Sequence, residues 1–177
     1  MMKKILKYTI SVTLIVIMLF SLSACGQEEY SEENNVDISV TADILLLFRA
    51  SGYEAQLFPE GIDNCIGVAE GYIDDSHYIY VNIFDSTKST VKIYEEEKTI
   101  ISEDTRDVVS GDESYIIEAD ESTDSYKKFA MKYVDLETTE VFYGSILQKN
   151  NVLISYHCPY DKRDEIENIV LKILELI

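Results

Sequence analysis

Apolar residues in the C-terminal segment recur with the period of an α-helix. They stand at positions i, i+3, i+4, i+7, i+8 and i+11 from Ile166 to Ile177. A helix with one such apolar stripe has to bury it against another layer of structure. The segment therefore predicts a helix over Lys162–Leu176, capped by Asp161, that packs on a sheet.

The preceding chain contains strands that could form this sheet. The links Asp74–Ser76 and Lys149–Asn151 are short and rich in turn-forming residues, which favours antiparallel pairing of the strands that they join. One strand has apolar bulk on both faces, which predicts that it is covered from two sides. The expected strands are Cys65–Ile73, His77–Phe84 (the one with two apolar faces), Lys127–Val134, Thr139–Gln148 and Val152–Cys158, with a short strand around Ser114–Glu118.

Two further helices are expected before the later strands. Val40, Ile44 and Phe48 share one side of a helix over Ser39–Ser51, which Gly52 can end. A second helix begins at a cap on Asp85 or Ser86 and runs to about Lys98, and most of residues 99–126 are read as a loop. The fold class is therefore α+β. We expect an antiparallel sheet of five to six strands packed by N- and C-terminal helices, similar to an α-β-α sandwich.

The N-terminus has the pattern of an export signal. Lys3, Lys4 and Lys7 precede an apolar run over residues 8–22. This run is shorter than the about 20 residues of a membrane-spanning helix and fits the apolar part of a signal peptide. Leu22-Ser23-Ala24-Cys25 follows directly and resembles the lipobox of bacterial lipoproteins.

The resemblance implies cleavage before Cys25 and a diacylglyceryl group on its thiol. The mature protein would then be held by acyl chains at the extracytoplasmic face of the cell membrane. An ordinary cleaved signal peptide and an uncleaved membrane anchor are the alternatives. We interpret residues 1–24 as a lipoprotein signal peptide, residues 25–38 as an acidic tether and residues 39–177 as a single domain.

Charge excludes one class of partner. The chain has a formal net charge of −18, and the part after Cys25 carries 33 acidic and 12 basic residues. Nucleic-acid binding needs a basic surface, so no nucleic-acid partner is expected.

No catalytic signature is present in the sequence. The glycine-rich phosphate loops, the nucleophile-elbow pattern and the spacings of zinc sites are all missing, so no catalytic residue, cofactor or metal is predicted. Calcium binding is left open at two acidic clusters, because carboxylates are its usual ligands. The clusters are Glu103, Asp104 and Asp107, and Glu118, Asp120 and Asp124.

Cys65 and Cys158 are the two cysteines of the expected domain. Outside the cytoplasm they could form a disulfide, and the alternative is a pair of buried free thiols. A nucleophilic pair of Cys65 with His157 is a further alternative, although no motif surrounds either residue.

Tyrosines supply the candidate binding surface. Tyr72, Tyr78 and Tyr80 lie close together in the first predicted hairpin, and an exposed tyrosine patch can stack on sugars or contact a protein. Half-buried sheet positions are the alternative, since tyrosine is common there. We expect a non-catalytic lipoprotein domain that binds an envelope protein or a wall component. A small wall-directed hydrolase and an accessory solute-binding lipoprotein are the other candidates.

Overall fold

The computed structural model describes residues 34–58, 63–108, 115–135 and 138–177, with the backbone alone for residues 103–108. The predicted signal peptide and Cys25 lie outside these ranges. The described elements are, in chain order, α2 Val40–Ala50, β1 Glu54–Phe58, β2 Cys65–Asp74, β3 His77–Phe84, α3 Thr87–Val108, β4 Tyr115–Ser122, β5 Lys127–Val134, β6 Val141–Lys149, β7 Val152–Pro159, a short 3₁₀ helix η2 Tyr160–Lys162, and α4 Arg163–Leu176.

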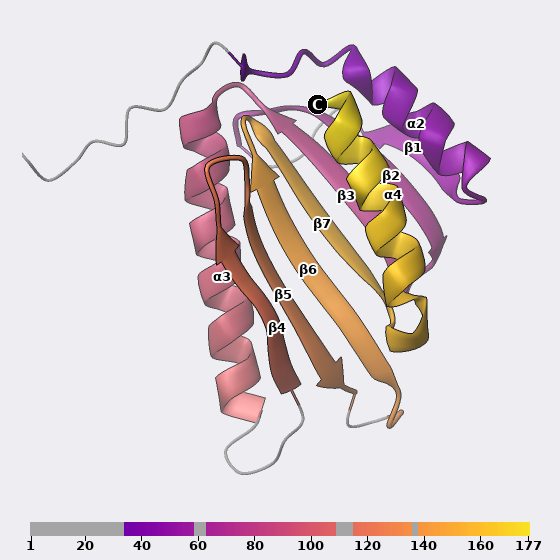
Figure 1. The fold of residues 1–177 in the computed structure, drawn as a ribbon, viewed down its shortest axis with the longest axis vertical. Helices are drawn as coiled ribbons and strands as arrows, with labels where there is room; N and C mark the ends of the chain where they lie inside the picture. The colour runs from indigo at the N-terminus through magenta and orange to yellow at the C-terminus, as the bar shows by residue number, and fades with distance from the viewer. Residues whose placement is uncertain (1–33, 59–62, 109–114, 136–137) are drawn as a thin grey trace, which may run out of the picture. The chain divides into compact units, whose positions relative to one another are not determined.

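A seven-stranded sheet forms the middle of the domain, in the order β1-β2-β3-β7-β6-β5-β4 (Figure 1). Every neighbouring pair is antiparallel. The α+β prediction is confirmed, with seven strands instead of five to six. β3 and β7 lie next to each other at the centre, where two hairpins meet, so β3 has paired neighbours on both sides and apolar layers on both faces.

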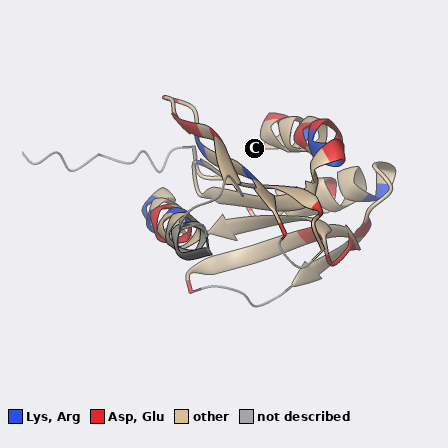
Figure 2. Cartoon of the chain, turned by 90° about the horizontal axis from the view of Figure 1, so that it is seen from below, with Lys and Arg blue, Asp and Glu red and all other residues tan. Residues whose placement is uncertain are grey.

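Helices cover both faces of the sheet (Figure 2). α2 and α4 lie on one face, over the larger core cluster, which includes Ile44, Phe48 and Ile166. α3 lies on the other face, where Tyr94 packs with Phe84 and Phe129. Alternation along β3 explains the two layers. Ile79, Val81 and Ile83 belong to the first cluster, and the intervening residues face α3.

Two segments differ from the prediction. β1 is missing from the prediction because its sequence, EAQLF, lacks alternation and is mostly exposed. Hydrogen bonds with β2 hold this segment in the extended conformation that its own sequence does not predict. α3 runs to Val108 instead of Lys98. The hydroxyl residues that suggested a loop are accommodated within the helix, where Thr99 Oγ1 donates to Glu95 O at 2.8 Å.

Helix ends agree only in part with the expected caps. Gly52 follows α2 with a φ of 88°, a left-handed conformation that glycine adopts without strain, so its predicted role is confirmed. Asp161 does not cap the last helix. It lies inside the 3₁₀ turn Tyr160–Lys162, and α4 begins after Lys162 without a side-chain cap.

Asn151 fixes the N-terminal segment to the domain. Its side chain accepts a hydrogen bond from Val36 N at 2.6 Å and donates to Val36 O at 3.0 Å and to Phe84 O at 2.8 Å. Thr87 Oγ1 donates to Asn35 Oδ1 at 2.8 Å. Asn35 and Val36, which belong to the expected tether over residues 25–38, therefore contact the folded domain, which begins before residue 39.

Cys65 and Cys158, the two cysteines in the described ranges, are free thiols. Cys65 pairs with Phe84 at one end of β3, while Cys158 follows His157, the partner of Tyr78, at the other end. About seven residues of strand separate these positions, or roughly 20 Å, whereas a disulfide needs Cα atoms within about 7 Å. The same separation corrects the alternative of a Cys65–His157 pair.

A thiol titration checks this arrangement. Burial raises the pKa of the Cys158 thiol to about 12 and also raises that of Cys65, so both are poor nucleophiles in the folded chain. We expect slow reaction with a thiol reagent under native conditions and full reaction of both in denaturant without reductant. A bridged pair would react in denaturant only after reduction.

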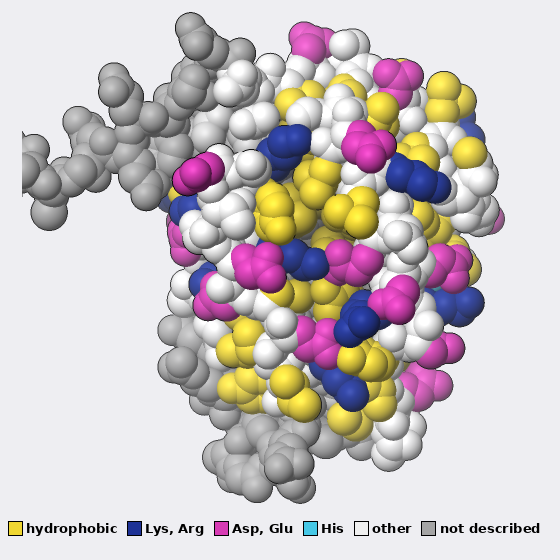
Figure 3. All heavy atoms as spheres, viewed as in Figure 1, with side chains coloured by type: hydrophobic (Ala, Val, Ile, Leu, Met, Phe, Trp, Pro, Cys, Tyr) yellow, Lys and Arg dark blue, Asp and Glu magenta, His cyan; other side chains and the backbone are white. Residues whose placement is uncertain are grey.

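The face that carries α2 and α4 has mixed charge (Figure 3). Side chains of both signs alternate there with hydrophobic ones, so the negative net charge does not form one continuous patch on this face. Within the described ranges, no helix is both long and apolar enough to span a bilayer.

Candidate functional site

The three predicted tyrosines gather on one face of the sheet. Tyr72 and Tyr78 are direct partners in the β2–β3 register. The ring centroids of Tyr78 and Tyr80 are 5.2 Å apart. All three side chains are half-buried. Alternation places them on the face that α3 covers.

A pocket of about 590 Å³ opens between α3 and this face. Strands β3, β7, β6 and β5 form its floor, and Glu97 and Ile101 of α3 form one wall. Rings dominate the lining. The aromatic side chains that face the pocket are Tyr78, Tyr80, Phe129, Tyr133 and His157. A second hollow borders it, lined by Glu70, Tyr72 and Asp74, and shares Tyr78 and Tyr80 with it.

His157 lies within the aromatic lining. Its ring stacks on Phe142, with centroids 5.0 Å apart, and on Tyr78, with centroids 5.4 Å apart. Nδ1 lies 2.7 Å from the carbonyl oxygen of Ser76, which can only accept, so Nδ1 carries the proton. Nε2 therefore accepts the hydroxyl of Tyr133 at 2.5 Å. Burial lowers the pKa of His157, which keeps the ring neutral at pH 7.

Glu97 brings a carboxyl group to the pocket without a positive partner. It is the last of three consecutive glutamates on α3. Glu95 pairs with Lys127 at 3.1 Å, and Glu96 pairs with Lys92 at 3.6 Å. Glu97 turns inward instead. Burial raises its pKa, and a hydrogen bond from Ser155 opposes that rise. Among the described residues no cationic side chain pairs with it.

Glu97, Phe129, Tyr133 and His157 are pocket residues that no motif in the sequence predicts. The inward orientation of Glu97 could be predicted from helical spacing, because Glu97 stands three residues after Tyr94 and four before Ile101, on the inward side of α3. Phe129, Met131 and Tyr133 likewise alternate along β5. What the sequence does not show is that β5, β7 and β3 lie near one another on this face.

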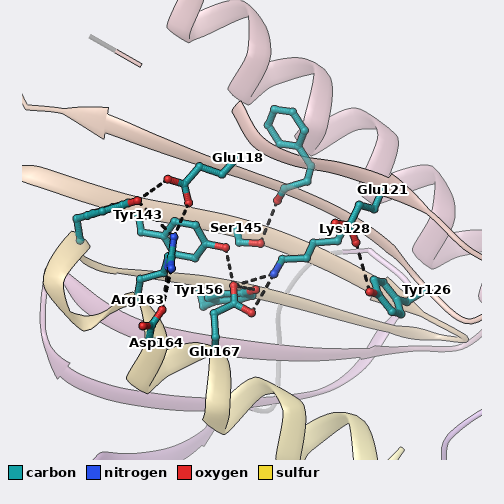
Figure 4. Close-up of polar contacts among 12 residues, drawn as sticks. Glu118, Glu121, Tyr126, Lys128, Tyr143, Ser145, Tyr156, Arg163, Asp164 and Glu167 are labelled. Atoms are coloured by element: carbon teal, nitrogen blue, oxygen red, sulfur yellow. Dashed lines mark hydrogen bonds and ion pairs between the residues drawn. The ribbon is translucent and has the colours of Figure 1, made fainter. Parts of the chain in front are cut away.

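A second polar cluster lies on the opposite face, between α4 and the sheet (Figure 4). Glu167 Oε1 accepts hydrogen bonds from the hydroxyls of Tyr143 at 2.5 Å and Tyr156 at 2.8 Å. Lys128 Nζ donates to both carboxylate oxygens, at 2.8 and 2.9 Å. The polar groups of this cluster satisfy one another's hydrogen bonds. We therefore interpret the cluster as structural, because it joins α4 to strands β5, β6 and β7.

The acidic clusters considered for calcium do not converge. Glu118 faces α4, where Tyr160 and Arg163 bond to it. Asp120 faces α3 and pairs with Lys98. The side chains of Glu103, Asp104 and Asp107 lie outside the described part of the chain. Over the part that is described, no three histidine, cysteine or acidic side chains gather into a metal-binding group.

The histidines make stability depend on pH. Burial lowers the pKa of His77 and of His157 from 6.5, and Tyr53 donates to or accepts from His77 Nε2 at 2.6 Å. Below about pH 6.5 the histidines of the unfolded chain bind protons that the folded chain does not bind. The contribution of the two neutral imidazoles to the free energy of unfolding is therefore complete above about pH 6.5, and it is lost as the pH falls through their lowered pKa values.

We therefore expect the free energy of unfolding to fall between about pH 7 and about pH 5.5, before most carboxylates titrate. Imidazole resonances followed by NMR give the two pKa values directly. A value at or above 6.5 for either ring in the folded protein would contradict this expectation.

Comparison with known proteins adds no function to this geometry. No protein-family model, no curated protein and no solved structure gives a significant match to the chain. The chemistry of the aromatic pocket, with the inward carboxyl group of Glu97, is therefore the basis on which a function can be proposed.

Proposed function

We propose that the protein is a lipid-anchored, extracytoplasmic binding domain that takes a small ligand in the pocket between α3 and the sheet. The observation that carries this proposal is the character of the pocket. Small-molecule sites are concave and mostly apolar, with a few polar groups that fix orientation, and they occupy about 300–1,000 Å³. Here Glu97, Asn82 and Ser155 are the polar groups among aromatic and aliphatic walls.

Binding without catalysis fits the state of the polar groups. Both ring nitrogens of His157 are engaged in hydrogen bonds of the fold, so this histidine has no free nitrogen for proton transfer to a substrate. Cys65 and Cys158 do not line the pocket. Cys65 lies at the opposite end of β3 from His157, and the side chain of Cys158 lies on the opposite face of the sheet from His157, so neither thiol can act together with this imidazole.

The position of the N-terminal segment suits a tethered binding domain. Val36 attaches beside Phe84, at one end of β3, whereas Tyr78 and His157 lie at the other end, about 20 Å away. Nine residues join Cys25 to Asn34, and they can reach about 30 Å. The point where the N-terminal segment joins the folded domain therefore lies at the end opposite the aromatic end of the pocket.

Small molecules that copurify with the protein test the proposed binding. The full chain is purified from membranes, the bound compounds are extracted, and they are compared with those from Tyr80→Ala, which removes a pocket wall. We expect a compound that is present in the first sample and depleted in the second. Tyr126→Ala, a tyrosine outside the pocket, is the matched control and should retain the compound. Equal recovery from all three proteins would reject the pocket as the site.

Mass spectrometry of the membrane fraction tests the anchor. We expect an N-terminal peptide that begins at Cys25 and carries a diacylglyceryl group. A peptide with intact Met1, or an unmodified Cys25, would overturn the lipoprotein assignment and leave the pocket unaffected.

A further inference from the structure

We propose that the ligand of this pocket is a small organic cation with an aromatic or aliphatic body, whose positive group lies beside Glu97. This inference rests on the proposed function, because it names the chemical class that the same pocket would take. Three independent features of the described residues support it: the unpaired carboxyl group, the rings around it, and the absence of positive side chains from the lining.

The first feature is the unmatched charge of Glu97. A half-buried carboxylate loses hydration, and a nearby positive charge or several hydrogen bonds normally compensate it. The neighbouring glutamates have lysine partners, whereas the partner of Glu97 among the described residues is the hydroxyl of Ser155. A cationic ligand would supply the missing counter-charge, whereas an anionic ligand would add a second uncompensated negative charge.

The second feature is the set of rings. Tyr78, Tyr80 and Tyr133 line the pocket together with Glu97. Aromatic faces attract cations through their quadrupole, and the attraction grows when the site is partly desolvated. A neutral imidazole at His157 adds no repulsion. The same rings can stack on the apolar body of a ligand, so one site can hold both parts of an amphiphilic amine.

The third feature is the sign of the surrounding charge. Neither lysine nor arginine is among the described residues that line the pocket or its neighbouring hollow. Lys98, which lies over Phe129, already pairs with Asp120. Glu70 borders Tyr80 and bonds to Gln56 at 2.6 Å, again without a positive partner among the described residues. With 33 acidic against 12 basic residues after Cys25, the protein attracts cations from a distance.

Three probes with one phenyl body separate charge from shape: phenethylammonium, phenethyl alcohol and phenylacetate. Their affinities are measured by calorimetry or NMR titration on the full chain in a nonionic detergent at neutral pH. We expect the ammonium probe to bind about tenfold more tightly than the alcohol, and the carboxylate probe to bind most weakly.

Variants at two adjacent glutamates locate the charge that causes the preference. Glu97→Gln should reduce the preference for the ammonium over the alcohol to about threefold or less while the affinity for the alcohol stays unchanged. Glu96→Gln removes one unit of the same charge from the exposed side of α3, where it pairs with Lys92, and should leave the preference intact. Thermal unfolding of both variants checks that they are folded.

The outcomes separate this inference from the proposed function. If the alcohol binds the wild-type protein as tightly as the ammonium probe, the proposed preference for a cationic ligand is overturned, and the pocket remains a binding site. If Glu96→Gln lowers the preference as much as Glu97→Gln, the effect comes from net charge and the assignment to Glu97 is overturned. If no probe binds and Tyr80→Ala leaves the copurifying compounds unchanged, both proposals fail.

Discussion

Gly71→Ala is expected to destabilise the domain by about 1–3 kcal/mol, the usual cost of overpacking a core. A Cβ atom on Gly71 would lie 2.7 Å from Cγ of Phe48 and within 2.9 Å of two further ring atoms. Phe48 is fully buried between α2 and the sheet. Its ring has no open space to move into, so either α2 or β2 has to shift to admit one methyl group.

Gly144→Ala is the matched control in the same sheet. A Cβ atom there would meet Tyr133 Cε1 at 3.8 Å and His157 Cδ2 at 3.9 Å, which are ordinary contacts. We expect the free energy of unfolding, measured by urea denaturation, to stay within about 0.5 kcal/mol of the wild type. Equal effects of the two substitutions would show that contact with Phe48 does not limit the size of residue 71.

A second substitution tests the cause of the Gly71 effect. Phe48→Leu creates space under β2 and is itself destabilising, because it removes buried ring atoms. If crowding is responsible, Gly71→Ala should cost less in the Phe48→Leu background than in the wild type. Strict additivity of the two changes would contradict steric crowding.

Local sequence patterns predict the central elements well because these elements satisfy local and tertiary preferences together. The prediction for β3, His77–Phe84, is confirmed in full, since apolar bulk on both faces matches a strand with a core on each side. β1 is the opposite case. Its residues have no strand pattern, and they enter the sheet through pairing with β2 and through contacts of Ala55 with the core and with Arg49 of α2.

The candidate site depends even more strongly on long-range strand pairing, which local sequence patterns do not predict. The grouping of Tyr72, Tyr78 and Tyr80 on one face could be predicted because they belong to one hairpin, where alternation decides the face, although they are half-buried and do not form an exposed patch. The pocket joins this hairpin to β5 and β7 through long-range pairing, which composition and periodicity do not determine. Glu97 is one of three consecutive glutamates, and only the rotation of α3 about its axis distinguishes it from the two that bind lysine in solvent.

Glu167→Ala is expected to destabilise the domain by about 2–4 kcal/mol. Loss of one partner of a buried ion pair costs about 3–5 kcal/mol, and we place this case slightly lower because the side chains of Lys128 and Glu167 are 16% and 24% exposed. The substitution leaves the ammonium of Lys128 without its counter-charge. It also leaves the hydroxyls of Tyr143 and Tyr156 without their acceptor (Figure 4).

Two variants separate the charge from the hydrogen bonds at this position. Glu167→Gln keeps an oxygen that can accept from the tyrosines and removes the charge that Lys128 needs, so its cost should be intermediate. Adding Lys128→Met to Glu167→Gln should recover part of the loss, because the double variant no longer has an unpaired lysine ammonium to bury.

Glu165→Ala is the control on the same helix. Glu165 pairs with Lys162 at 3.3 Å, but both side chains are about half exposed, and exposed pairs contribute about 0–1 kcal/mol. We expect urea denaturation to rank the variants as Glu165→Ala, Glu167→Gln and Glu167→Ala, in order of rising cost. If Glu167→Ala cost no more than Glu165→Ala, the four-residue cluster would not be what holds α4 on strands β5, β6 and β7. The apolar stripe of α4 alone would then account for its packing.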